Sequence, residues 1–225
     1  MPKKSSQTPS VSSPKIPTHQ AVFIKLREAI LFGDLKPGQA VTIQGLTSMI
    51  GAGVTPVREG LRRLISQGAL EMHDNRRITV PELTSDMISE IEFMRLALEP
   101  ELTKRFAARA EVNHIEKLRQ IDERLNAAIK MGDVHNYLLY NHAFHLTIYN
   151  DANAPIMSQA ADRLWLRFSP SLRVVCGRFG TQNLPDKHDE LLKALDEGDV
   201  DAAGTAIAGD IRQGMDQMLQ ALNNS

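Results

Sequence analysis

The chain has 225 residues, of which 42% are hydrophobic and 24% are charged, which is ordinary for a globular protein of one or two domains. Its single cysteine, Cys176, excludes a disulfide framework within one chain. No stretch resembles a secretory leader or an apolar segment of membrane-spanning length, so we expect a cytoplasmic protein with no membrane partner.

Charge is distributed unevenly along the chain. Residues 1–80 hold 11 Lys and Arg against 5 Asp and Glu, a net charge of +6, whereas residues 81–225 hold 15 against 22, a net charge of −7. The total of −1 therefore hides a basic N-terminal third. This asymmetry predicts that only this third meets a polyanion.

Residues 1–17 are rich in Lys, Ser, Thr and Pro and have too little apolar surface to fold. We expect a disordered basic arm, which either adds weak attraction to phosphate or is a solvated tail. Helical spacing of apolar residues then runs from Thr18 to Phe32, and Gly33 provides a helix stop. A turn signal at Pro37-Gly38 precedes a short second helix around residues 46–50.

A third helix is predicted to begin with Thr55 as its N-cap and Pro56 at its first helical position. One face is apolar and the opposite face carries Arg58 and Arg62. Two short helices joined by a turn, with arginines on the free side of the second, are typical of a helix that enters the major groove of DNA. The alternative is that these arginines only solvate a surface helix.

Two strands are predicted at residues 69–73 and 78–80, joined by the basic hairpin tip Asp74-Asn75-Arg76-Arg77. Such a tip can reach an adjacent minor groove. The ordered set of turn, helix and basic hairpin favours DNA binding over simple solvation. The expected DNA contacts are Thr55, Arg58, Arg62, Arg76 and Arg77.

These residues resemble a known family. The segments Pro37-Gly38, TPVREGL from Thr55, Gly68-Ala69-Leu70 and NRRITV from Asn75 are similar to the winged-helix signature of GntR-type bacterial transcription regulators. That resemblance implies contacts to DNA from the third helix and from the hairpin tip. The family usually has Ser-Arg where this chain has Gly53-Val54, Ala at Gly60 and Gly at Arg77. The operator of relatives therefore cannot be carried over to this chain.

After residue 82 the apolar positions recur at intervals of three and four, without strand-like alternation or a repeat. The pattern predicts an all-helical bundle of about six or seven helices over residues 83–225. The predicted fold is therefore mainly α, with a winged helix-turn-helix domain at residues 18–82 before this bundle. Predicted helical stretches after the first are residues 115–130, 134–150, 154–175, 186–197 and 199–222.

Four polar residues of the bundle are predicted to converge. Asn141 and His145 are four residues apart and share one helix face. His188 and Asp210 lie about equally far from a turn near Gly198, so an antiparallel hairpin brings them level. These side chains can bind zinc, nickel or manganese.

The bundle also resembles the FCD ligand-binding domain of FadR-like regulators, through motifs at residues 94–99, 141–145, 150–153 and 187–195. The resemblance implies a divalent metal held by one Asp and three His, which helps to bind a small carboxylate effector. The family's Asp falls on Asn141, its first His on His145, and its spacing of 22 between two His leads from His188 to Asp210. The formal charge of the set is unchanged by this exchange.

We predict a homodimeric transcription regulator that binds a two-fold DNA operator under the control of a small organic acid. Arg95 and Arg167 are the expected contacts to the acid, although Arg95 can instead pair with Glu99. His145 and His188 can instead be hydrogen-bonded core residues without metal. Two other interpretations remain: a metal-dependent hydrolase or oxygenase that uses His145, His188 and Asp210, and a DNA-binding module whose bundle only dimerises.

Overall fold

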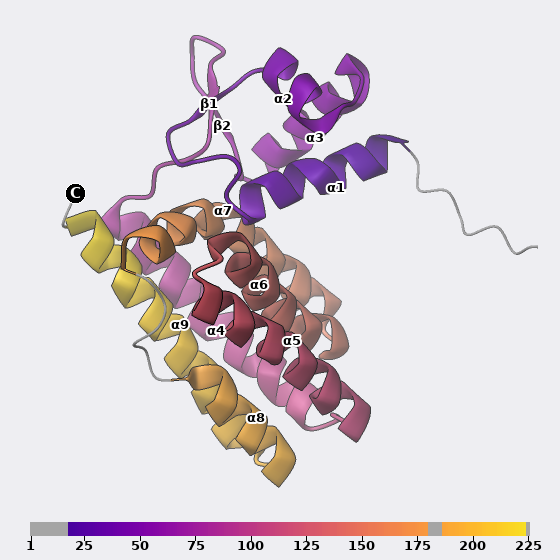
Figure 1. Cartoon of the computed structure of the whole chain (residues 1–225), viewed down its shortest axis with the longest axis vertical. Coiled ribbons are helices and arrows are strands. Elements are labelled where there is room, and N and C mark those ends of the chain that lie inside the picture. The colour runs from indigo at the N-terminus through magenta and orange to yellow at the C-terminus, as the bar shows by residue number, and fades with distance from the viewer. Residues whose placement is uncertain (1–17, 180–185, 224–225) are drawn as a thin grey trace, which may run out of the picture.

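The computed structural model describes residues 18–179 and 186–223, so the predicted arm at residues 1–17 lies outside the described residues. Figure 1 shows a small unit of helices with a β-hairpin at one end of a larger helical bundle. We call residues 18–80 the winged unit and the six helices that follow it the helical bundle. Within the described residues, no helix combines the length and the apolar character needed to cross a membrane.

The winged unit contains three helices and a small antiparallel sheet with the strand order β1-β3-β2. Val57, Leu61 and Leu64 of its third helix are buried against the first helix, as the periodicity predicted. The hairpin between β2 and β3 projects from the unit as a wing (Figure 1). The elements are α1 (Thr18–Leu31), β1 (Ala40–Val41), α2 (Ile43–Ile50), α3 (Val54–Ser66), β2 (Glu71–Met72) and β3 (Ile78–Thr79).

Helix α3 begins earlier than the sequence suggested. Its N-cap is Gly53 and its first helical residue is Val54, so the prediction of Thr55 as N-cap was wrong. Pro56 remains acceptable at the third helical position, because the N–H groups of the first helical turn have no partner within the helix. Thr55 is therefore free of a capping role and lies exposed in the first turn of the helix.

Close packing of α1 on α3 depends on Gly60. A Cβ atom added at this position would lie 2.5 Å from the Cδ1 atom of Leu26, which is fully buried on α1. The alanine usual in relatives would therefore force Leu26 or the helix to shift.

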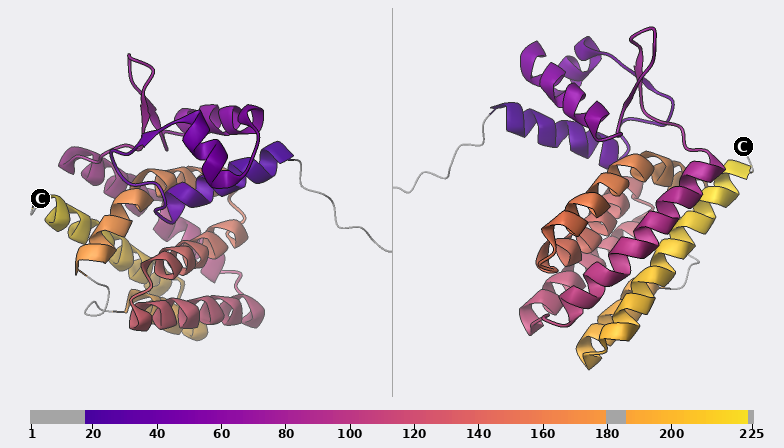
Figure 2. Two further views of the ribbon diagram at one scale, coloured as in Figure 1. Left: turned by 45° about the horizontal axis from the view of Figure 1, so that its top comes forward. Right: turned by 180° about the vertical axis from the view of Figure 1, so that it is seen from behind.

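The helical bundle consists of six long helices, in agreement with the predicted stretches to within a few residues. Figure 2 shows α4 and α9 side by side along the outer face of the bundle, and these two helices form its most extensive helix pair. The helices are α4 (Ser85–Ala107), α5 (Val112–Met131), α6 (Val134–Asp151), α7 (Pro155–Phe179), α8 (Lys187–Glu197) and α9 (Val200–Asn223).

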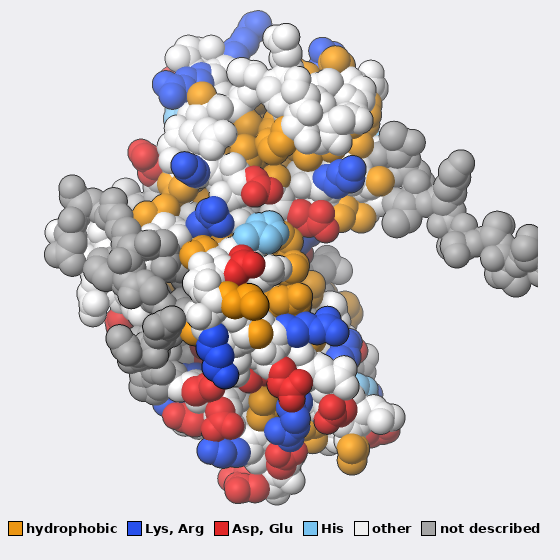
Figure 3. Space-filling model, viewed as in Figure 1, with side chains coloured by type: hydrophobic (Ala, Val, Ile, Leu, Met, Phe, Trp, Pro, Cys, Tyr) orange, Lys and Arg blue, Asp and Glu red, His pale blue; other side chains and the backbone are white. Residues whose placement is uncertain are grey.

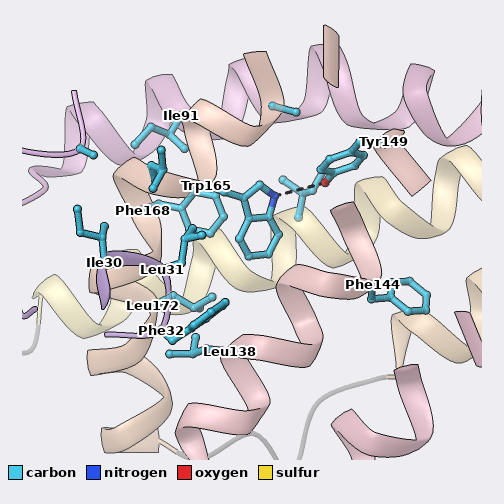
Figure 4. Packing of buried hydrophobic residues seen from close by; sticks show 14 of the residues in the cluster. Ile30, Leu31, Phe32, Ile91, Leu138, Phe144, Tyr149, Trp165, Phe168 and Leu172 are labelled. Atoms are coloured by element: carbon cyan, nitrogen blue, oxygen red, sulfur yellow. Dashed lines mark hydrogen bonds between the residues drawn. The ribbon is translucent and has the colours of Figure 1, made fainter. Parts of the chain in front are cut away.

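The winged unit and the bundle share one hydrophobic core. In Figure 4, Phe32 from the end of α1 lies beside Leu138 of α6 and Leu172 of α7, with Trp165 farther into the bundle. Because the apolar side chains are contiguous, the two units are packed together rather than linked by a flexible tether.

Helix α7 supplies further contacts to the winged unit. The Cδ atom of Arg173 lies 1.9 Å from the position that a Cβ atom on Gly33 would take, and the guanidinium of Arg167 lies 3.1 Å from that on Gly68. Both glycines have positive φ and follow the C-terminal ends of α1 and α3. Any side chain at Gly33 or Gly68 would therefore strain the backbone and clash with an arginine of α7.

Candidate nucleic-acid interface and metal centre

The predicted contacts on α3 are on the surface. Thr55, Arg58 and Arg62 are exposed, and together they line a groove of about 560 Å³ on the winged unit. Figure 3 shows basic side chains over the winged unit, away from the mixed acidic and basic surface at the far end of the bundle. The first turn of α3 has unpaired N–H groups and a positive helix end. This surface has the charge and shape to meet the DNA backbone and base edges.

Arg63 is on a different face of the same helix. Its guanidinium carbon lies 3.6 Å from the centre of the Phe23 ring on α1, and Nη1 donates to Gln20 Oε1 at 3.4 Å. Arg63 therefore holds α3 to α1, while Arg58 and Arg62 are exposed on the helix surface.

The hairpin tip is ordered by local hydrogen bonds. Arg77 N donates to Asn75 Oδ1 at 3.0 Å, and His73 N donates to the Arg77 carbonyl at 2.9 Å. Arg76 has a φ of 63°, a left-handed conformation that is unfavourable for a residue with a side chain. Both arginines are exposed. The left-handed position is thus Arg76, one residue before the position at which relatives usually have glycine.

Three of the four predicted metal ligands come together in the bundle. His145 Nε2 lies 3.2 Å from one oxygen of Asp210, and His188 Nε2 lies 3.9 Å from the other. All three ligand atoms lie within 4.8 Å of one another. The turn at Gly198 brings α8 and α9 alongside each other and sets His188 level with Asp210, as the spacing predicted. We call these three residues the His-His-Asp cluster.

Outer hydrogen bonds orient both histidines of the cluster. His145 Nδ1 lies 3.0 Å from the Tyr149 hydroxyl oxygen, and that hydroxyl donates to Glu99 Oε2 at 2.5 Å. His188 Nδ1 lies 3.1 Å from Asp122 Oδ1. Because each Nδ1 faces an oxygen acceptor, each Nε2 is left to face Asp210. A metal-binding histidine is usually fixed in this way by a partner on its other ring nitrogen.

Burial and neighbouring charges act in opposite directions on the cluster. Burial lowers the pKa of His145, against the raising effect of Asp210 and Glu99. Its Nε2 atom is buried without a hydrogen-bond partner and faces the carboxylate of Asp210. Burial by itself would raise the pKa of Asp210, but the nearby histidines outweigh this and hold the pKa below its ordinary value.

His188 differs from His145 in its protonation. Burial opposes its charged form, but the hydrogen bond to Asp122 and the charge of Asp210 outweigh burial and raise the pKa of His188. Its ring also stacks on Phe144, with centroids 3.9 Å apart and planes at 7°. The ring is thus held in place on three sides.

The donor set fits a divalent metal. Tetrahedral zinc with bonds of about 2.0–2.1 Å holds its ligand atoms about 3.4 Å apart, close to the 3.2 and 3.9 Å distances between Asp210 and the two histidines. The Asp210 side chain is 22% exposed, so the cluster has one side open to solvent. Three protein ligands with an open side are typical of a metal that also binds a small molecule.

Asn141 is buried on α6, one helical turn before His145. The part of Asn141 in metal binding stays a prediction.

The two predicted effector contacts lie in different places. Arg95 is buried on α4, and its Nε and Nη2 atoms donate to Glu99 at 2.6 and 3.0 Å. Its guanidinium also lies over the rings of Phe168 and Trp165, at 4.4 and 5.1 Å from their centres. Arg167 is exposed at the junction with the winged unit, against Gly68. The effector role stays a prediction for both, and the position of Arg167 favours a role between the units.

Sequence reasoning missed the outer partners of the cluster. Asp122 occupies an inward position of α5, four residues after buried Leu118 and three before buried Leu125. A carboxylate at a core position of an amphipathic helix is a signal that was present in the sequence. Tyr149 carried a similar signal, since it follows His145 by four residues on the same helix.

Two family models match the chain. The model described as "FCD domain" matches residues 90–213, and the model described as "Bacterial regulatory proteins, gntR family" matches residues 18–80. The first match covers most of the helical bundle and the second coincides with the winged unit.

Relatives match over nearly the whole chain. The HTH-type transcriptional regulator McbR of Escherichia coli is 28% identical over 88% of this chain and 91% of its own length. A probable D-xylose utilization operon transcriptional repressor of Paenarthrobacter nicotinovorans is 25% identical over 84% of this chain and 85% of its own length. The solved structure of E. coli McbR covers 92% of this chain and 99% of its own, with a TM-score of 0.84 and 27% identity.

Proposed function

Because the chain belongs to the GntR-type bacterial transcription regulators and carries an FCD domain, we propose that it is a cytoplasmic homodimer whose operator affinity is set by a small carboxylate in the helical bundle. The chain is a DNA-binding regulator and not an enzyme. The alternative of a metal-dependent hydrolase or oxygenase is thereby excluded.

The exposed Arg58 and Arg62 on α3 are the observation that carries the DNA-binding half of the proposal. Each recognition helix reads only a few base pairs, and a two-fold pair of helices doubles the sequence that is read. Several phosphate contacts per dimer make the affinity strongly dependent on salt.

The test is to select duplexes from a random library with the full chain and to measure their affinity between about 50 and 200 mM salt. We expect two-fold symmetric sequences and a steep fall of affinity with salt. Affinity that does not change with salt, or no selected sequence at all, would refute this half of the proposal.

A divalent metal in the His-His-Asp cluster is the second part of the proposal. It is supported by the unpaired Nε2 of His145 beside the Asp210 carboxylate. Such an ion would act as a Lewis acid that anchors the effector carboxylate at the open side of the cluster. Arg95 donates to Glu99 through Nε and Nη2, and it would contact the same carboxylate through its other N–H groups.

The measurement is metal content per monomer by plasma mass spectrometry, for protein purified without a histidine tag or chelator. We expect about one zinc, nickel or manganese ion per wild-type monomer and its loss in His188→Ala. Metal-free wild-type protein that also fails to take up added zinc would refute the metal site.

A small-acid effector is tested by thermal unfolding with a panel of mono- and dicarboxylates, with and without added zinc. We expect at least one saturable stabilisation that needs the cluster. Intact operator binding without any saturable ligand would instead support a bundle that only dimerises.

The homodimer is supported by an apolar strip on the outer face of α4. Phe93 is 75% exposed and Met94 is 47% exposed, which is unusual for neighbouring large apolar side chains on one helix. Phe93→Glu should convert the dimer to monomer in analytical ultracentrifugation. Val112→Glu is the matched control, because Val112 is equally apolar and exposed but lies on α5. A dimer that persists in Phe93→Glu would exclude this strip as the interface.

A further inference from the structure

We propose that the Arg27–Asp162 ion pair and His142 couple the His-His-Asp cluster to the winged unit. The pair joins the first helix of the winged unit to α7 of the bundle. Arg27 Nη2 donates to both oxygens of Asp162, at 2.6 and 2.8 Å. These two hydrogen bonds connect a side chain of the winged unit directly to a side chain of the bundle.

His142 stands between this ion pair and the cluster. Its Nε2 atom lies 3.9 Å from Asp162 Oδ1, and its ring meets the ring of Phe32 edge to face, with centroids 6.1 Å apart. His142 is on α6, three residues before His145, so any shift of α6 at the cluster moves both histidines. His142 therefore lies close to both Phe32, directly after α1, and Asp162, which pairs with Arg27 of α1.

Trp165 completes the contact on the bundle side. Its ring centre lies 5.0 Å from that of His145 and 5.2 Å from that of His142. The indole is 2% exposed and packed on Phe168, so it has little room to move independently. A rearrangement of His145 is thus passed through a rigid ring to His142.

Unpaired polar atoms lie in the cluster and near the junction. Four buried side-chain atoms of the described residues lack a hydrogen-bond partner, and one of them, His145 Nε2, belongs to the cluster. The others are His142 Nε2, Arg173 Nη1 beside Gly33, and Gln67 Oε1 next to Gly68. Buried polar groups are almost always paired, so an interface that leaves three unpaired is poorly satisfied as it stands. Two arrangements of similar free energy are what a coupling contact requires.

A groove of about 720 Å³ runs along the same junction, and its lining includes Arg27, Phe32, His142 and Asp162. The groove lies between α1 on one side and α6 and α7 on the other. We therefore infer that occupation of the cluster changes the tilt of α1 on the bundle, and with it the position of α3, which packs on α1.

The inference rests on the proposed function, and a double-mutant cycle in the full chain tests it. The variants are Arg27→Met, which removes the charge but keeps the stem, and Asp210→Asn, which changes the cluster. The affinity for a selected operator duplex is measured for the wild type, both single variants and the double variant. Zinc titration of each protein provides the second readout.

We expect Asp210→Asn to change operator affinity at least about fivefold in the wild-type background, a typical allosteric coupling. In the Arg27→Met background the change should shrink to less than about twofold. Zinc affinity should be the same in Arg27→Met as in the wild type, which separates coupling from damage to the cluster. Lys104→Ala is the control, because it breaks the exposed pair with Asp201, far from the junction.

The outcomes separate the inference from the proposed function. An equal effect of Asp210→Asn in both backgrounds overturns the coupling role of Arg27 alone. No effect in the wild-type background overturns both the coupling and the sensor role of the cluster. Absence of operator binding in every variant, the wild type included, refutes the proposed function itself.

Discussion

The winged unit and the helical bundle hold their functional residues in opposite environments. Arg58 and Arg62 lie one turn apart on a single exposed helix. His145, His188 and Asp210 come from three helices and meet around a largely buried point. The first arrangement is set by local sequence and the second by packing. Substitution of the exposed arginines should therefore lower DNA affinity without changing the stability of the fold. Substitution in the cluster should change both ligand binding and stability.

The largest effect is expected at the buried Arg95–Glu99 ion pair. Arg95→Ala removes the cationic partner of the buried Glu99 carboxylate, which should cost about 3–5 kcal/mol of unfolding free energy. Urea unfolding measures this loss. Arg119→Ala, which breaks an exposed pair with Asp196, should cost less than about 1 kcal/mol. Similar losses in both variants would contradict the contrast between core and surface.

On α3, two arginines on different helix faces should separate binding from stability. Arg58→Ala should lower operator affinity by about 1–3 kcal/mol in free energy while unfolding is unchanged. Arg63→Ala removes the contact to Phe23 and should instead cost about 1 kcal/mol of stability. Mobility-shift titrations measure the operator affinity of both variants, and urea titrations measure their stability. Loss of affinity in Arg63→Ala but not in Arg58→Ala would show that the recognition surface includes Arg63 instead.

Asp122→Asn tests whether the outer partner of His188 matters for metal binding. Loss of such a partner typically lowers metal affinity about 10–100-fold, and calorimetric zinc titration measures it. Asp189→Asn is the control, since Asp189 is exposed on the same helix as His188. Unchanged zinc affinity in Asp122→Asn would remove Asp122 from the metal site.

The smallest effect is expected at the wing. Arg76→Gly relieves the left-handed backbone and should raise stability by up to about 1 kcal/mol, whereas Arg76→Gln should not. Both should lower operator affinity slightly through the lost charge. Thermal unfolding of both variants measures the effect of backbone strain on stability, and mobility-shift titrations measure the effect of the lost charge on operator affinity. Equal stability in the two variants would show that the strain is negligible.

The winged unit could be predicted in detail because its signals are local. The turns, the apolar face of α3 and the hairpin all follow from neighbouring residues. The error at Thr55 placed the N-cap two residues too late, because Gly53 takes that position. The left-handed residue at Arg76 was one position from the expected glycine site. Such one-residue differences depend on turn geometry that spacing alone does not determine.

In the bundle, prediction worked where two helices are joined by a short turn. The level placement of His188 and Asp210 follows from the hairpin at Gly198. Asp122 could not be placed beside His188 in this way, because the α5–α8 contact joins helices far apart in sequence. Arg167 was expected to contact the effector, and it lies exposed at the junction with the winged unit. Which face of α7 is inward is decided by packing with α1, and no local pattern encodes that.

Trp165 is the only tryptophan of the chain, and it lies between His145 and His142. Its emission is therefore an intrinsic optical reporter beside both the His-His-Asp cluster and the proposed coupling contact at His142. Imidazolium ions quench indole fluorescence and metal-bound imidazoles do so differently, so the intensity should follow the state of either neighbour. Unlabelled protein can thus be titrated with metal, carboxylate effector or operator DNA, and Trp165 emission can report the binding of each.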